Sequence, residues 1–215
     1  MEVLTERASV CPIADKRDWL FNVWTMCSTL TQLAPYLDRP RSDVDVVICD
    51  RGIFDALCWF QWLVNNGHLD NVTHGHLSGF LCLPRFRAAL DLVYVFTSTA
   101  ERSIEREYAY LLTRQQGSIM NDDVLRSYYD AIAETMTTYR PRFRKVEHID
   151  TTDLDQNHVG SQVTEKVLEV LRDAAEERIG YVPKEELQLP PGGAVACRWS
   201  ELLRNPSSPP ELKFG

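Results

Sequence analysis

An apolar, β-branched run that ends in an Asp-Arg pair constrains the fold of this chain more than any other segment. The run covers Val44 to Cys49, Asp50 and Arg51 follow it, and an apolar helical pattern begins near Phe54. A strand that passes into a helix in this way is typical of α/β proteins, in which ligands bind outside the carboxyl ends of parallel strands. The pair would then stand at the mouth of a ligand crevice, and an inert, solvated ion pair is the alternative.

Strands and helices alternate along most of the chain, which predicts a parallel sheet built by right-handed crossovers. We expect strands near residues 2–5, 44–49, 90–96 and 146–149, and helices near 16–37, 54–64, 76–89, 100–112, 121–139 and 159–177. The segment with His68, His74 and His76 is expected to be an ordinary surface loop rather than a metal site. The predicted fold class is α/β, with three layers, α/β/α, around the sheet.

The composition indicates one domain followed by a different tail. The chain has 215 residues, of which 44% are apolar and 25% charged, as in ordinary globular proteins. Residues 1–178 are therefore expected to form one α/β domain. Proline, glycine and serine accumulate over residues 179–215, which predicts an extended or disordered tail.

Charge and cysteine usage restrict the partners and the compartment. The net charge of −8 argues against a nucleic-acid polymer or an anionic membrane as partner, so a small molecule is expected. The six cysteines include no Cys-x-x-Cys motif, which indicates reduced thiols and a cytoplasmic location. No segment has the pattern of a signal peptide or a membrane span. A homodimer is possible, because the sequence does not decide the oligomeric state.

A group of arginines forms the second candidate site. Arg102 and Arg106 share one helical face, and Arg114 follows just before a glycine-containing turn. Together they would form an anion-binding edge. Each of the first two is flanked by glutamates, so a solvated surface helix with internal salt bridges is the alternative.

Two more polar groups lie where strands are expected to end. Glu6 follows the first strand and would face the same crevice as Asp50, unless it simply pairs with Arg7. The last strand is followed by a polar segment of the kind that often holds a base or a sugar, beginning with Asp150, Thr151 and Thr152.

In this order and spacing, these residues resemble the P-loop nucleoside and nucleotide kinases, in particular the thymidylate kinase and deoxynucleoside kinase group. The resemblance covers about residues 1 to 175. It implies that Asp50 and Arg51 contact the phosphate or 5′-hydroxyl end of an acceptor nucleoside, and that Glu6 approaches the acceptor as a catalytic carboxylate.

The same resemblance implies roles for the remaining residues and a donor system. Arg102, Arg106 and Arg114 would clamp the phosphates in transit, and the segment of Asp150 to Thr152 would lie near adenine. ATP and Mg²⁺ would be the donor system, with no dedicated metal site assigned to residues of this chain. Phosphoryl transfer needs mainly positioning and positive charge around the transferred group.

The chain departs from this family at its phosphate-binding loop. No Gly-x-x-x-x-Gly-Lys-[Ser/Thr] sequence occurs in it. Matching residues 2–6 to the family's second strand implies that the first strand, the phosphate loop and the first helix are missing. A sheet in the family's order, 2-3-1-4-5, would then have two unpaired inner edges.

Two interpretations of this departure remain open. The first is a nucleoside or nucleoside-monophosphate kinase that is shortened at its amino end and inactive as given. The second is a degenerate relative that closed the gap between its strands and serves as a non-catalytic nucleotide-binding or regulatory module.

Overall fold

The computed structural model describes residues 1–38, 44–109 and 120–180, with residues 175–180 described by their backbone only. The chain divides into two compact units, Met1–Val170 and Leu171–Gly215. Nearly all of the predicted tail, residues 179–215, lies outside the described residues. The sites described below belong to the first unit.

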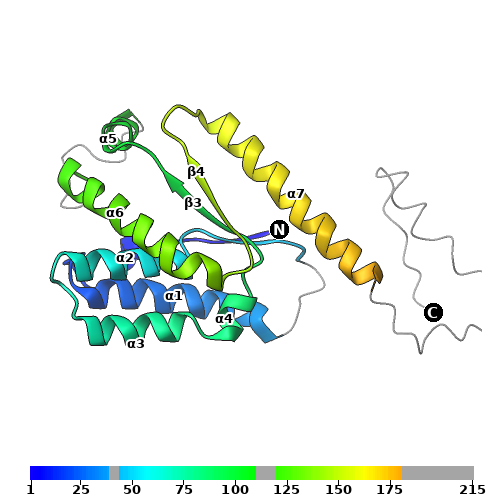
Figure 1. The fold of residues 1–215 in the computed structure, drawn as a ribbon, viewed down its shortest axis with the longest axis horizontal. Helices are drawn as coiled ribbons and strands as arrows, with labels where there is room; N and C mark the ends of the chain where they lie inside the picture. The colour runs from blue at the N-terminus through cyan, green and yellow to red at the C-terminus, as the bar shows by residue number, and fades with distance from the viewer. Residues whose placement is uncertain (39–43, 110–119, 181–215) are drawn as a thin grey trace, which may run out of the picture. The chain divides into compact units, whose positions relative to one another are not determined.

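Strands and helices alternate in the described residues (Figure 1), which confirms the mixed α/β class. The strands are β1 (Glu2–Leu4), β2 (Val47–Cys49), β3 (Val93–Thr97) and β4 (Val146–Asp150). The helices are α1 (Trp19–Asp38), α2 (Ile53–Asn65), α3 (Asn71–Leu81), α4 (Pro84–Ala88), α5 (Ala100–Ala109), α6 (Asp122–Tyr139) and α7 (Gln156–Gly180), with 3-10 turns at Ala8–Val10 and Arg140–Arg142. Helix predominates, and the strands are short.

The strands form two separate parallel pairs. β1 pairs with β2, so that Val3 lies opposite Ile48, and β3 pairs with β4, so that Val95 lies opposite His148. Within residues 1–38, 44–109 and 120–180, no ladder of hydrogen bonds joins one pair to the other. Each strand therefore has one edge whose backbone groups no described strand satisfies.

Helix α2 lies at the centre of the core. Its sequence, IFDALCWFQWLVN, is apolar on almost every side, and a helix of that kind has to be enclosed. It packs against α1, α3 and, most extensively, α6. Leu57 and Phe60 are completely buried as a result. The helix ends as predicted, with Gly67 in the left-handed region at a φ of 73°.

The β3–β4 pair has helices on both faces. Val95 and Val146 belong to the same buried cluster as the side chains of α2 and α6. Tyr94 faces the other way, because successive side chains of a strand alternate between its two faces. Its hydroxyl donates to the backbone oxygen of Val163 in α7 at 3.2 Å.

The β1–β2 pair is covered less completely. Leu4 is buried, but Val3 and Ile48, which lie opposite each other, are 50% and 43% exposed. Parallel strands are normally covered on both faces, so an open apolar pair is unusual. One face of this pair therefore exposes the kind of surface that further structure normally covers.

The segment with His74 and His76, expected to be a loop, is helix α3 instead. Asp70 begins it as an N-cap, accepting hydrogen bonds from the backbone N–H groups of Val72 and Thr73, each at 2.9 Å. The helix expected over residues 76–89 is accordingly two helices, α3 and α4, the second starting at Pro84. Two glycines in α3 lower its helix propensity, which hid the helix from the sequence pattern.

Candidate functional site

The ends of β1 and β2 bring Glu6 and Arg51 together. Glu6 follows β1, and Asp50 and Arg51 follow β2, where the N–H of Asp50 donates to the oxygen of Leu4 at 2.9 Å. Parallel pairing therefore aligns two polar segments that are far apart in sequence. Arg51 Nη1 lies 3.2 Å from Glu6 Oε1, so the ion pair of Glu6 is made with Arg51.

Arg51 has a strained backbone. Its φ is 57°, and it is the one non-glycine residue with a positive φ in the described parts of the chain. The left-handed conformation costs a residue with a side chain about 1–2 kcal/mol. It leaves the Arg51 side chain 49% exposed beside Glu6. Strain of this kind accumulates at functional sites, where the position of a side chain matters more than stability.

Asp55 and Tyr128 complete this site, and neither was predicted from the sequence. Asp55 lies in the first turn of α2, and Tyr128 of α6 donates from its hydroxyl to Asp55 Oδ1 at 3.1 Å. Trp59 stacks on the Tyr128 ring with 4.2 Å between centroids. Asp55 is the one charged residue of a mostly apolar helix, and that signal could have identified it. We call Glu6, Asp50, Arg51, Asp55 and Tyr128 the arginine cluster.

The pKa values of two carboxyl groups in the cluster, those of Asp55 and Glu6, are raised. Burial raises the pKa of Asp55, while the charge of Arg51 and the hydrogen bond from Tyr128 oppose the rise. Burial also raises the pKa of Glu6, Arg51 opposes that rise, and the other two carboxylates of the cluster add to it. Negative charge is therefore already crowded here.

The two other titratable groups keep the form in which they donate hydrogen bonds. Burial, followed by the charge of Asp55, raises the pKa of Tyr128 well above its usual value, so its hydroxyl stays protonated. Burial alone would lower the pKa of Arg51, but the surrounding carboxylates raise it. Arg51 therefore stays a cation.

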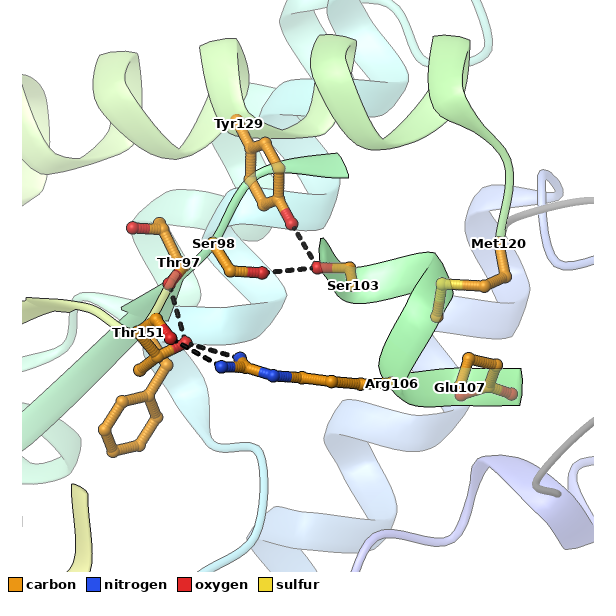
Figure 2. A pocket seen from close by; sticks show the side chains of 9 residues that line it. Thr97, Ser98, Ser103, Arg106, Glu107, Met120, Tyr129 and Thr151 are labelled. Carbon is orange, nitrogen blue, oxygen red and sulfur yellow. Dashed lines mark hydrogen bonds between the residues drawn. The ribbon is translucent and has the colours of Figure 1, made fainter. Parts of the chain in front are cut away.

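A second site lies at the carboxyl ends of β3 and β4. A pocket of about 320 Å³ opens there, lined by Phe96, Thr97, Ser98, Ser103, Arg106, Glu107, Met120, Tyr129 and Thr151. Five of these residues carry a hydroxyl group, and Figure 2 shows three of the hydroxyl groups in a chain. Ser103 Oγ lies 2.6 Å from Ser98 Oγ and 2.8 Å from Tyr129 Oη.

The Arg106 side chain points across this pocket toward Thr151 (Figure 2). Its Nη2 donates to the backbone oxygens of Thr151 at 2.6 Å and Leu154 at 2.8 Å, and its Nη1 donates to Thr151 Oγ1 at 3.1 Å. Arg106 thus fastens α5 to the segment between β4 and α7. A guanidinium has five N–H groups, and several of these already have partners.

The other predicted arginines differ from Arg106. Arg102 pairs with Glu105 on the same helix, which is the solvated arrangement that the sequence left open. Arg114 lies outside the described residues. The anion-binding edge formed by all three arginines therefore stays a prediction.

The segment after β4 is fixed to the end of β3. Thr151 donates to the oxygen of Thr97 from its N–H at 2.7 Å and from its hydroxyl at 2.9 Å. Asp150 accepts from the N–H and the hydroxyl of Thr152, and these hydrogen bonds lower the pKa of Asp150. Thr151 therefore lines the pocket as part of a rigid segment.

The predicted residues thus form two groups, the arginine cluster and the β3–β4 pocket. Within the part of the chain that the structure describes, no three His, Cys, Asp or Glu side chains are grouped so that they could hold a metal ion. None of the helices in that part combines the length and the apolar composition needed to cross a membrane.

No protein-family model matches this chain, and a search of curated proteins also finds no match. The function is therefore inferred from the chemistry of the two sites.

Proposed function

We propose that this protein is kinase-like and binds nucleotides, with a nucleoside or nucleoside monophosphate as acceptor at the arginine cluster. The observation that carries the proposal is Arg51, held in a strained conformation at the ends of β1 and β2 with its side chain half exposed beside Glu6. In such kinases an acidic residue and an Asp-Arg pair approach the acceptor. The pocket beside Thr151 would take the adenine of the donor, ATP.

The pairing of the strands supports the proposal. The family's sheet has the order 2-3-1-4-5, and removal of strand 1 leaves strands 2 and 3 as one pair and strands 4 and 5 as another. The described part of this chain contains two such pairs, β1–β2 and β3–β4. The exposed Val3 and Ile48 are also the kind of surface that the helix of a strand–helix unit covers. The three-layer P-loop fold is part of this proposal.

In this proposal the chain's own residues act by positioning. Arg51 can donate hydrogen bonds to an acceptor oxygen, and the carboxylate of Glu6 can accept one from an acceptor hydroxyl. Magnesium in such enzymes supplies charge neutralisation on the donor phosphates. The described residues offer no three-residue cage for it, so we derive no step through the metal.

Calorimetry on the protein tests the binding half of the proposal. Nucleosides, their 5′-monophosphates and ATP are titrated separately, and we expect an acceptor affinity of about micromolar. Arg51→Ala should weaken that affinity by about tenfold or more. Arg144→Ala is the matched control, because Arg144 also forms an exposed ion pair, with Asp91 at 2.9 Å, away from the cluster. Equal losses in both variants, or no binding of any compound, would contradict the proposal.

The absence of a Gly-x-x-x-x-Gly-Lys-[Ser/Thr] sequence favours one alternative, a non-catalytic nucleotide-binding module. A fusion protein with a strand, a phosphate-binding loop and a helix ahead of Met1 distinguishes the kinase from the non-catalytic module. A kinase should then consume ATP in the presence of the acceptor that binds. A module should bind the acceptor and consume none.

A further inference from the structure

We infer from the charges around Arg51 that the acceptor is an uncharged nucleoside, bound through a hydroxyl group, and not a nucleoside monophosphate. This inference rests on the proposed function and narrows it. It concerns the arginine cluster alone and makes no use of the pocket beside Thr151.

Carboxyl groups predominate in the arginine cluster. Carboxyl groups reach Arg51 from three places: Glu6 after β1, Asp50 after β2, and Asp55 in the first turn of α2. Lys16, ahead of α1, is a second cation close enough to influence Glu6. Tyr128 of α6 adds a neutral hydroxyl. Carboxyl groups therefore outnumber cations around the exposed guanidinium.

The charge of Arg51 already has a partner. Glu6 Oε1 lies 3.2 Å from Arg51 Nη1, and the charge of Asp55 acts on the same guanidinium. A phosphate monoester brings a charge of about −1.5 to −2 at neutral pH. At Arg51 it would either displace Glu6 or add to a crowded group of carboxylates, and like charges within a few ångströms repel strongly.

A hydroxyl group fits both members of the Glu6–Arg51 pair. The carboxylate of Glu6 accepts a hydrogen bond, and the guanidinium of Arg51 donates one, so one acceptor hydroxyl can satisfy the two together. Glu6 is partly accessible, at 29% exposure, and so has room to make this contact. An uncharged acceptor adds no charge to the cluster.

Paired titrations test the inference on the unmodified protein. Thymidine, deoxycytidine, deoxyadenosine and deoxyguanosine are each compared with their own 5′-monophosphate by calorimetry at near-neutral pH. At least one nucleoside should bind about tenfold or more tightly than its monophosphate. If every monophosphate binds as tightly as its nucleoside, or more tightly, the inference is overturned and the proposed function stands. If neither the nucleosides nor the monophosphates bind, both the inference and the proposed function are wrong.

Two further measurements test whether repulsion between the phosphate and the carboxylates causes the preference for the nucleoside. Glu6→Gln keeps a hydrogen-bond acceptor but removes one negative charge, so it should shift the preference by about tenfold toward the monophosphate. Asp91→Asn makes the same charge change in an ion pair at the other end of β3, and should leave the preference unchanged. Added salt should also weaken the discrimination, because it screens exposed charges. A preference that neither Glu6→Gln nor salt alters would overturn the inference.

Discussion

Tyr128 and Tyr129 are neighbours on α6, yet their hydroxyl groups belong to different sites. Tyr128 Oη donates to Asp55 Oδ1 at 3.1 Å in the arginine cluster, whereas Tyr129 Oη lies 2.8 Å from Ser103 Oγ in the β3–β4 pocket. Successive residues of an α-helix point about 100° apart, which follows from 3.6 residues per turn. One turn of α6 therefore supports both sites.

Tyr128→Phe should destabilise the protein. The change keeps the ring that stacks on Trp59 but takes the hydroxyl donor away from Asp55. A buried acceptor that loses its partner costs about 1–3 kcal/mol. Urea unfolding at neutral pH measures the loss. Tyr94→Phe is the control, because its hydroxyl donates to a backbone oxygen outside the cluster, and its loss should be smaller. If both variants lost the same free energy of unfolding, the hydrogen bond from Tyr128 to Asp55 would have no special importance for stability.

Asp55→Asn should change how stability depends on pH. Because the pKa of Asp55 is raised above 3.8 in the folded protein, the folded state holds this proton more tightly than the unfolded chain does. The contribution of Asp55 to stability therefore falls as the pH rises from the ordinary carboxyl value through the raised one. The free energy of unfolding of Asp55→Asn, relative to the unmodified protein, should be lowest in acid and should increase toward neutral pH. A difference that stays constant over a pH series of urea unfolding curves would refute this.

Arg51→Gly and Arg51→Ala should differ in stability although both lose the guanidinium. The φ of 57° suits glycine and strains alanine, so the glycine variant should be more stable by about 1 kcal/mol. Thermal or urea unfolding of the two variants measures the difference. If the two variants were equally stable, the backbone at residue 51 would relax when the arginine side chain is removed.

Arg106→Ala should cost about 2 kcal/mol of stability, because its hydrogen bonds hold the segment after β4. Arg102→Ala is the matched control on the same helix, where an exposed pair with Glu105 contributes at most about 1 kcal/mol. Unfolding curves of the two variants make the comparison. If both changes have the same small effect, Arg106 does not hold this segment and is available for a ligand.

The boundaries of several elements could be predicted because they depend on local chemistry. Asn121 caps α6 by accepting from the N–H of Val124 at 3.1 Å, and the helix runs to Tyr139, just before Pro141. The start of α5 likewise uses Thr99, whose hydroxyl oxygen accepts from the N–H of Arg102. Such signals lie within a few residues of the ends that they set.

The completion of the site could not be predicted, because its contacts join distant segments. Asp55 and Tyr128 are 73 residues apart, and no local pattern marks Tyr128 as the donor to Asp55. The partners of Arg106 are equally hidden, because backbone oxygens leave no mark in the sequence. A cation near the end of a strand indicates that an anion or a carbonyl is bound, but not which of the two.

The enclosed position of α2 influences the order in which parts of this molecule unfold. In many α/β proteins the central strands are the last part to exchange their amide hydrogens with solvent, whereas here each described strand has one edge that no other described strand pairs with. Leu57 to Leu63, by contrast, lies on a helix with neighbours on several sides. Deuterium should therefore enter this stretch of α2 last, and the helix rather than the sheet would be the final part of the native state to be lost.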